Sequence, residues 1–182
     1  LFAAWERRVD ASDRHWRIRA SDIVLAAGAI ERPLWFANND LPGVMSAEAA
    51  LHYLALYGAV AGRNIVLATG NDASYPVADA LARAGCAVTL ADAREKTPPP
   101  PEGVKHLSSA RLTRAEGKRA VRSVIVNGQR HEADTVLVSG GYTPSVHLHC
   151  QAGGKLDWEA GSDSLVPRPG TSKLRVVGAA NG

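Results

Sequence analysis

Residues 64–94, NIVLATGNDASYPVADALARAGCAVTLADAR, decide the fold. The apolar run 65–68 predicts a buried strand, the apolar spacing after Gly70 predicts a helix ending at Gly85, and residues 87–91 predict a second strand. A parallel strand pair needs such a helical crossover to return the chain. The stretch therefore predicts a β-turn-α-β unit of a doubly wound nucleotide-binding domain.

The turn at Gly70 carries part of a dinucleotide fingerprint. Gly70 and Asn71 follow the first strand, and Asp92 lies about 20 residues later, where an acid would accept from a ribose 2′-hydroxyl. However, Asp72 and Tyr75 stand at the second and third glycine positions of G-x-G-x-x-G. The carboxylate stands where the backbone should approach a pyrophosphate, and the ring stands where helix and strand should meet closely. Cofactor binding by Gly70, Asn71 and Asp92 is therefore the weaker of two site predictions.

Composition excludes several classes of function. The 182 residues carry 21 Lys and Arg against 18 Asp and Glu, interleaved along the chain, which argues against a nucleic-acid partner. No apolar run approaches the roughly 20 residues of a membrane span, so we expect a soluble, cytoplasmic protein. The two cysteines form no C-x-x-C motif, which argues against a dithiol redox centre.

The segments before residue 64 predict strands and one helix. Trp16 and Ile18 alternate as in a half-exposed strand, and the continuous apolar run 23–26 predicts a buried one. Ser46 can cap a helix over residues 47–57 that ends at Gly58.

The segments after residue 94 predict a surface loop, a hairpin and two strands. Four consecutive prolines, 98–101, predict an extended surface loop, and Asn127-Gly128 predicts a hairpin turn. Residues 106–115 and 120–127 show weak strand alternation, the run 135–138 predicts a buried strand, and 142–172 reads as mostly irregular.

The last apolar run, residues 174–177, lacks a strand partner nearby, and its natural mate is the run 23–26. This pairing predicts one α/β domain inserted into another of the same three-layer, Rossmann-like type. The predicted division is an outer-domain first half over 1–60, an inserted NAD(P)-binding-like domain over 61–142, and a return segment over 143–182.

The chain resembles a family of flavoproteins. IVLAAGAIERP (23–33), LRVVGAANG (174–182) and their places around the insertion resemble two-dinucleotide-domain flavoproteins of the disulfide-reductase type. FANNDLPGVM (36–45), GNDASYPVA (70–78) and SGGYTPSVHLHCQAGGKL (139–156) resemble, more narrowly, the α subunits of heterotetrameric sarcosine oxidases. By this resemblance the chain is a middle fragment of a longer polypeptide.

The resemblance implies a function for the complex rather than for this chain alone. It implies oxidative demethylation of sarcosine to glycine with O2 as acceptor, NAD in this subunit, and FAD and FMN elsewhere in the complex. It also implies β, γ and δ partner subunits and a separate folate-binding domain. Two alternatives stay open: a subunit of an opine or related amine dehydrogenase, and a degenerate, non-catalytic nucleotide domain used for assembly.

The resemblance also places the second, stronger site prediction in the outer domain. Ala27, Gly28 and Ala29 stand where related proteins bring a strand end close to the cofactor, although a plain turn would use the same residues. Ala180-Asn181 replaces a Gly-Asp pair, and an amide there weakens an FAD interpretation and is compatible with NAD. A helix cap at Asn181 is an equal alternative.

No catalytic residue and no metal site emerge from the sequence. His147, His149 and Cys150 are suitable ligand types, but on an extended segment the cysteine would point away from the histidines. No second cluster completes four ligands. We therefore expect no metal and no amine oxidation by this chain alone.

Overall fold

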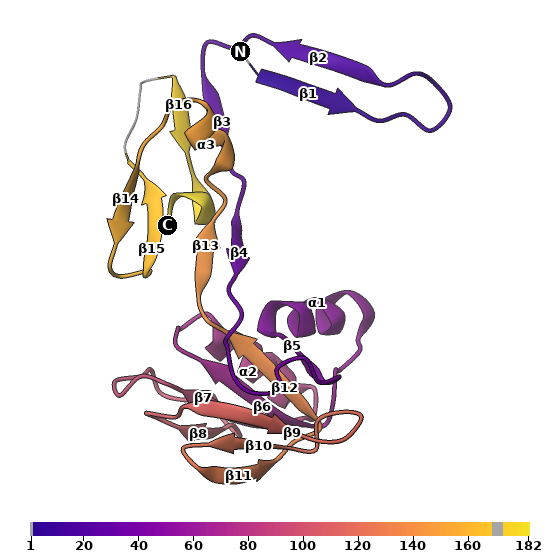
Figure 1. The fold of residues 1–182 in the computed structure, drawn as a ribbon, viewed down its shortest axis with the longest axis vertical. Helices are drawn as coiled ribbons and strands as arrows, with labels where there is room; N and C mark the ends of the chain where they lie inside the picture. Colours follow the sequence, from indigo (N-terminus) through magenta and orange to yellow (C-terminus); the bar gives the residue numbers. More distant parts are fainter. Residues whose placement is uncertain (1, 169–172) are drawn as a thin grey trace. The chain divides into compact units, whose positions relative to one another are not determined.

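The computed structural model describes residues 2–168 and 173–182 (Figure 1). Contacts divide the chain into two compact units. The inner unit is residues 31–142, and the outer unit combines residues 1–30 with residues 143–182. No helix among the described residues is long and apolar enough to cross a membrane.

The inner unit is built on a five-stranded parallel sheet in the order β5-β12-β6-β7-β8. β6 and β12 are almost wholly buried because both faces of the sheet are covered, which explains their continuous apolar sequences. The predicted β-turn-α-β unit is confirmed as β6, α2 and β7. The elements are β5 (Val44–Ser46), β6 (Asn64–Thr69), α2 (Ser74–Arg83), β7 (Ala87–Asp92), β8 (Lys105–Leu107) and β12 (Thr135–Ser139).

Alternate residues of β6 supply two separate cores. Ile65 and Leu67 pack with the apolar faces of two helices, α1 (Ala47–Tyr57) and α2. Val66 and Ala68 pack on the opposite face, against an antiparallel ribbon. Side chains alternate across a strand, so one apolar run serves both cores and gives three layers. The ribbon consists of β9 (Leu112–Glu116), β10 (Ser123–Val126) and β11 (Gln129–Glu132).

Helix α1 begins and ends as its sequence predicts. The Ser46 hydroxyl accepts a hydrogen bond from the Ala49 amide at 3.2 Å, and Gly58 closes the helix with φ 62°. A Glu31 carboxylate oxygen accepts from the Glu48 amide at 2.9 Å. Because β5 pairs with β12 and α1 packs on α2, residues 31–60 lie in the inner unit, whereas the sequence places the domain boundary at 60/61.

The ribbon confirms one prediction and refines another. Asn127 and Gly128 have φ of 50° and 76°, as a two-residue hairpin turn between β10 and β11 requires. The weak alternation over 106–115 is split between two sheets. Its start lies in β8, beside β7, and its end lies in β9, beside β10.

The outer unit contains the strand pair expected from the two distant apolar runs. β3 (Ile23–Leu25) and β16 (Leu174–Val176) are parallel, with Leu25 opposite Val176. β1 (Phe2–Glu6) and β2 (Arg14–Ile18) form a separate hairpin. β4 (Ala29–Glu31) and β13 (Tyr142–Pro144), which carry the chain across the unit boundary, pair with each other.

The expectation that residues 142–172 are mostly irregular is wrong for the described part of that segment. It contains α3 (His147–Gln151) and an antiparallel pair, β14 (Leu156–Glu159) and β15 (Ser164–Pro167). A 3-10 turn, η1 (Gly178–Asn181), follows β16. Residues 169–172 lie outside the described part.

Candidate functional site

The first candidate site is the turn between β6 and α2 in the inner unit. Asn71 braces it, because its side-chain amide donates to the backbone oxygen and the hydroxyl of Ser139, both at 3.1 Å. The other end of the same side chain accepts from the Ala73 amide at 3.1 Å. Asn71 therefore ties the ends of β6 and β12 together, and its polar atoms are used within the protein.

Hydroxyl groups close the base of this turn. Thr69 Oγ1 and Ser74 Oγ lie 2.7 Å apart, and Thr69 Oγ1 also accepts from the Asn71 amide at 3.1 Å. Gly70 is absent from the residues with positive φ, and a Cβ added there would meet no atom within 4 Å. The turn thus bends through side-chain hydrogen bonds rather than through a glycine conformation.

Asp92 ends β7 beside this turn and is fully buried. One carboxylate oxygen, Oδ2, accepts from Arg94 Nη2 at 2.7 Å and from the Tyr75 hydroxyl at 3.0 Å. Burial alone would raise the pKa of Asp92, but the hydrogen bonds from Arg94 and Tyr75 outweigh it and hold the pKa below its usual value. Asp92 is therefore an ionised internal acceptor.

Arg94 joins Asp92 to Asp72. Its Nη1 lies 2.7 Å from Asp72 Oδ1, on the exposed side of the turn. Hydrogen bonds to Asp92 and Asp72 raise the pKa of Arg94 above its usual value, although burial opposes the shift. We call Arg94, Asp72, Asp92 and Tyr75 the Arg94 clasp.

Tyr75 connects the clasp to His106 of β8. Its hydroxyl lies 3.3 Å from His106 Nε2 in addition to donating to Asp92. Burial raises the pKa of Tyr75, so the hydroxyl stays protonated as a donor at neutral pH. The sequence indicated Tyr75 only as an obstacle, and it missed Arg94 and His106. Arg94 could have been noticed as a cation two residues after the acid of the fingerprint.

The second candidate site lies in the outer unit, where β3 and β16 end. The parallel register brings both carboxyl ends to one edge of this strand pair. Gly28, after β3, has φ 71°, and Gly178, after β16, has φ 65°. A Cβ added to either glycine would meet no atom within 4 Å, so each backbone faces open space.

The predicted residues at this edge differ in what they offer. Ala180 is fully buried, backbone and side chain alike, so it packs beneath this edge and exposes no atom to a ligand. Asn181 is exposed at the end of η1, and its side chain has no hydrogen bond to a described residue. Ala27 is exposed, Ala29 begins β4, and the Gly28 carbonyl accepts from the Ser145 amide at 2.9 Å. The structure brings the two loops to one edge, but Gly28 and Asn181 form no hydrogen bond with each other.

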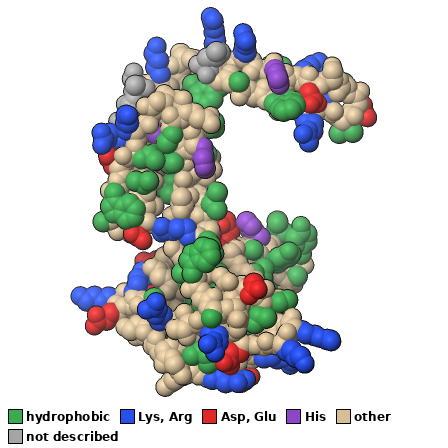
Figure 2. All heavy atoms as spheres, in the orientation of Figure 1, with side chains coloured by type: hydrophobic (Ala, Val, Ile, Leu, Met, Phe, Trp, Pro, Cys, Tyr) green, Lys and Arg blue, Asp and Glu red, His purple; other side chains and the backbone are tan. Residues whose placement is uncertain are grey.

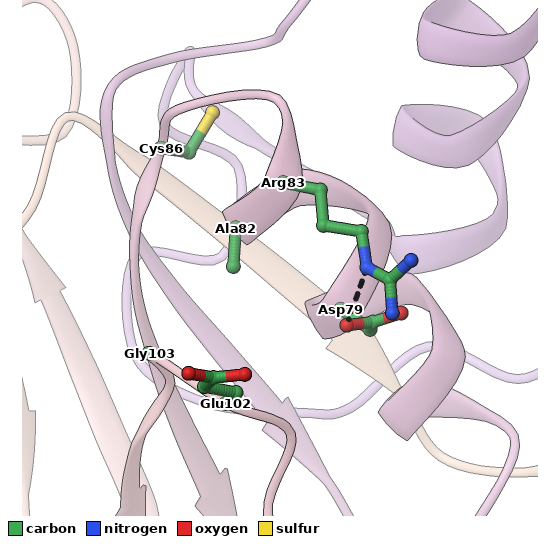
Figure 3. Close-up of a pocket in the computed structure, with 6 residues that line it drawn as sticks. All are labelled: Asp79, Ala82, Arg83, Cys86, Glu102 and Gly103. Carbon is green, nitrogen blue, oxygen red and sulfur yellow. Dashed lines mark hydrogen bonds and ion pairs between the residues drawn. The ribbon is translucent and has the colours of Figure 1, made fainter.

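A cavity of about 330 Å³ lies on the inner unit, and none of its lining residues belongs to the turn after β6 (Figure 3). Its walls come from the second half of α2 and from the loops that follow α2 and the prolines. Arg83 and Asp79 pair across one side at 3.0 Å. Burial raises the pKa of the Cys86 thiol, which lowers its reactivity. The lining residues are Asp79, Ala82, Arg83, Cys86, Glu102 and Gly103.

The histidine cluster considered in the sequence is helical rather than extended. His149 lies in α3, is 2% exposed, and its Nε2 lies 3.0 Å from the Lys155 carbonyl oxygen. A Cβ on Gly154 would lie 2.2 Å from that nitrogen, so the Gly153-Gly154 turn makes room for the ring. No metal-binding group of three or more His, Cys, Asp or Glu occurs in the described residues.

Acidic and basic side chains are intermixed on the face of the inner unit seen in Figure 2. This distribution matches the interleaved charges of the sequence. A continuous basic surface, which a nucleic acid would require, is not visible on that face.

Sequence comparison finds the same similarity as the motifs. The chain is 38% identical over 187 residues to sarcosine oxidase subunit alpha from Corynebacterium sp. (strain P-1) and 39% identical over 180 residues to that from Rhizobium meliloti (strain 1021). These alignments cover 93% and 92% of the chain but only 19% and 18% of the relatives. The chain thus spans about a fifth of their length. No protein-family model matches it.

Solved structures with the same fold include a dehydrogenase and a reductase. L-proline dehydrogenase from P. horikoshii superposes with a TM-score of 0.68 at 27% identity, covering 88% of this chain and 30% of that one. Thioredoxin reductase from Lactococcus lactis superposes with a TM-score of 0.64 at 15% identity, covering 99% and 65%. The chain is therefore homologous to one region of an oxidoreductase subunit and has the disulfide-reductase-like FAD/NAD(P)-binding fold.

Proposed function

We propose, on the premise that this chain is homologous to one region of sarcosine oxidase α subunits, that it is the NAD-binding scaffold of an amine-oxidising complex. The single observation that carries the proposal is the 38% identity over 93% of the chain. The complex would oxidatively demethylate sarcosine to glycine with O2 as acceptor. This chain would hold a cofactor and position partner subunits, and it would be inactive alone.

Within the scaffold, the outer unit is the proposed NAD site. Two glycines with positive φ face open space where β3 and β16 end, so a cofactor could approach the protein backbone closely there. The exposed Asn181 amide can both donate to and accept from a neutral ligand group. Ala27 and Ala29 flank Gly28 with small side chains, and the fully buried Ala180 would support the site from within.

Oxidation would take place outside this chain. FAD and FMN in the complex would supply the electron transfer, and the β, γ and δ subunits would complete the substrate site. A folate-binding domain would receive the one-carbon unit in the cytoplasm. Residues 1–182 contribute binding and orientation, as proteins that hold such cofactors generally do.

The cofactor content of the full-length subunit, purified with its partners, tests this assignment. Gly28→Leu places a side chain in the open space and Asn181→Ala removes the amide, so both should lower bound NAD at least tenfold. Gly103→Leu is the matched control, because Gly103 also has positive φ and open space. Gln151→Ala, an exposed amide of the outer unit, is the control for Asn181→Ala.

Asp92→Ala should leave the NAD content unchanged, provided that the variant folds. Loss of NAD in the two control variants as well would show a general defect instead of a site. Full NAD content in both Gly28→Leu and Asn181→Ala would refute the outer-unit assignment.

A second candidate function is that of a subunit of an amine dehydrogenase. The similarity to L-proline dehydrogenase, at 27% identity and a TM-score of 0.68, favours it. The two candidates differ in electron acceptor. Sarcosine-dependent O2 consumption by the assembled complex would support the oxidase, and turnover only with an artificial dye acceptor would support the dehydrogenase.

A further inference from the structure

Asp92 stands where a nucleotide-binding unit of this fold places its ribose acceptor, yet its acceptor capacity is already used. Oδ1 accepts from the Arg94 amide at 2.9 Å and from Arg94 Nε at 3.0 Å. Oδ2 accepts from Arg94 Nη2 at 2.7 Å and from the Tyr75 hydroxyl at 3.0 Å. An ionised carboxylate has about four lone-pair sites, so a ribose hydroxyl could bind only by displacing one of these donors.

The backbone around Arg94 is held as firmly as its side chain. The Ala93 amide donates to the Thr69 carbonyl at 2.9 Å, which joins the end of β7 to the end of β6. The Ser109 amide donates to the Arg94 carbonyl at 2.9 Å, and the Ala110 amide donates to the Asp92 carbonyl at 2.8 Å. The guanidinium therefore starts from a defined backbone position and is oriented further by Asp92.

The third nitrogen of the guanidinium reaches across the turn. Arg94 Nη1 lies 2.7 Å from Asp72, which stands at the second glycine position of the fingerprint. The Asp72 side chain is 70% exposed, so this pair alone would be weak. Because the buried Asp92 orients Arg94, however, the pair holds a carboxylate where a pyrophosphate would approach the start of α2.

We propose that Arg94 is the residue that closes the inner unit to dinucleotides. Its guanidinium donates hydrogen bonds to Asp92, the residue that would accept from a ribose hydroxyl. It also pairs with Asp72 and so holds that carboxylate across the Gly70 turn. This inference concerns the inner unit only and does not depend on the outer-unit assignment.

An arginine at the end of the second strand can also bind the 2′-phosphate of NADP. In this chain, Nε and Nη2 face Asp92, and Nη1 faces Asp72. Carboxylates of the same chain thus pair with all three nitrogens of the guanidinium. NADP+ binding at Arg94 is consequently the main alternative that the experiment must detect.

The first test removes both closing groups in the full-length subunit. Arg94→Ser with Asp72→Gly frees Asp92 and restores the second glycine, so calorimetric titration with NAD+ should show one site more per chain than wild type. Arg83→Ser with Asp79→Ser is the matched control, because it removes another Arg-Asp pair linked to α2. The readout is the difference between variant and wild type, so it is valid whether or not the outer unit binds NAD.

A folded double variant, judged by circular dichroism, that gains no NAD+ site would overturn the proposal. A gain in the control pair would overturn it as well, because the effect would not be specific to the clasp.

The second test uses the wild-type subunit and needs no variant to fold. Modification of arginines by phenylglyoxal, mapped by mass spectrometry, should be unchanged at Arg94 by saturating NAD+ or NADP+. Protection of Arg94 by NAD+ would show that the inner turn binds a dinucleotide. Protection by NADP+ alone would show a 2′-phosphate site, and either result overturns the proposal.

Discussion

The turn after β6 and the strand ends of β3 and β16 both lie at the carboxyl ends of parallel strands, yet they are built in opposite ways. The first is filled by its own side chains, with Arg94 bound to Asp72 and Asp92. The second presents Gly28 and Gly178 with open space beside each. The contrast shows that a parallel sheet of this kind tolerates a turn filled by ion pairs, because its apolar cores lie on the two faces of the sheet.

The largest expected effect comes from breaking the clasp. Arg94→Ala leaves the buried Asp92 carboxylate without its charge partner, which should lower the free energy of unfolding by about 3 kcal/mol. Arg83→Ala is the control, since its side chain is 80% exposed, and should cost about 0.5 kcal/mol. Urea denaturation followed by circular dichroism measures both. Equal losses would mean that the clasp is only a surface ion pair.

A smaller effect should appear on acidification. The folded-state pKa of Asp92 is lowered, so its contribution to stability is complete above about pH 4, the ordinary Asp value, and is lost as the pH falls through the folded-state pKa. The difference in unfolding free energy between wild type and Asp92→Asn should therefore shrink below about pH 4. Asp40→Asn, which removes an exposed carboxylate of the inner unit, is the control. A difference that stays constant with pH would contradict the role given to the Asp92 charge.

The smallest effect separates the two glycines that begin the turns. Gly28→Ala places a side chain at φ 71° and should destabilise the protein by about 1 kcal/mol. Gly70→Ala has open space and no positive φ, so it should change stability by less than about 0.5 kcal/mol. Thermal unfolding of the two variants compares them directly. A larger loss at Gly70 would show that the inner turn needs its glycine after all.

Sequence reasoning reached the parts of the fold that rest on apolar patterns. The continuous runs in β6, β7 and β12 predicted a buried parallel sheet, and the lone run at 174–177 predicted its pairing with β3. The pair β14 and β15 was missed, because short strands among glycines and prolines carry little periodicity. Residues 31–60 were assigned to the outer domain because nothing local shows that β5 joins β12.

The site was harder to predict than the fold. Positions such as Gly28 and Asn181 came from resemblance, and their cofactor role stays a prediction. Asp92 was identified by spacing alone, yet its partners depend on how far Arg94, Tyr75 and His106 reach across three elements. Such reach is a property of the tertiary structure, which explains why the clasp was not foreseen.

The pairing of β3 with β16 also has a consequence for the order of folding. The whole inner unit, residues 31–142, separates the two strands along the chain, so pairing them from the unfolded state closes a very long loop. Once the inner unit has folded, β4 and β13 bring its two ends side by side, so the remaining loop runs only through residues 26–28 and 145–173. Folding of the inner unit therefore lowers the entropy cost of pairing β3 with β16, and we expect this outer strand pair to form last.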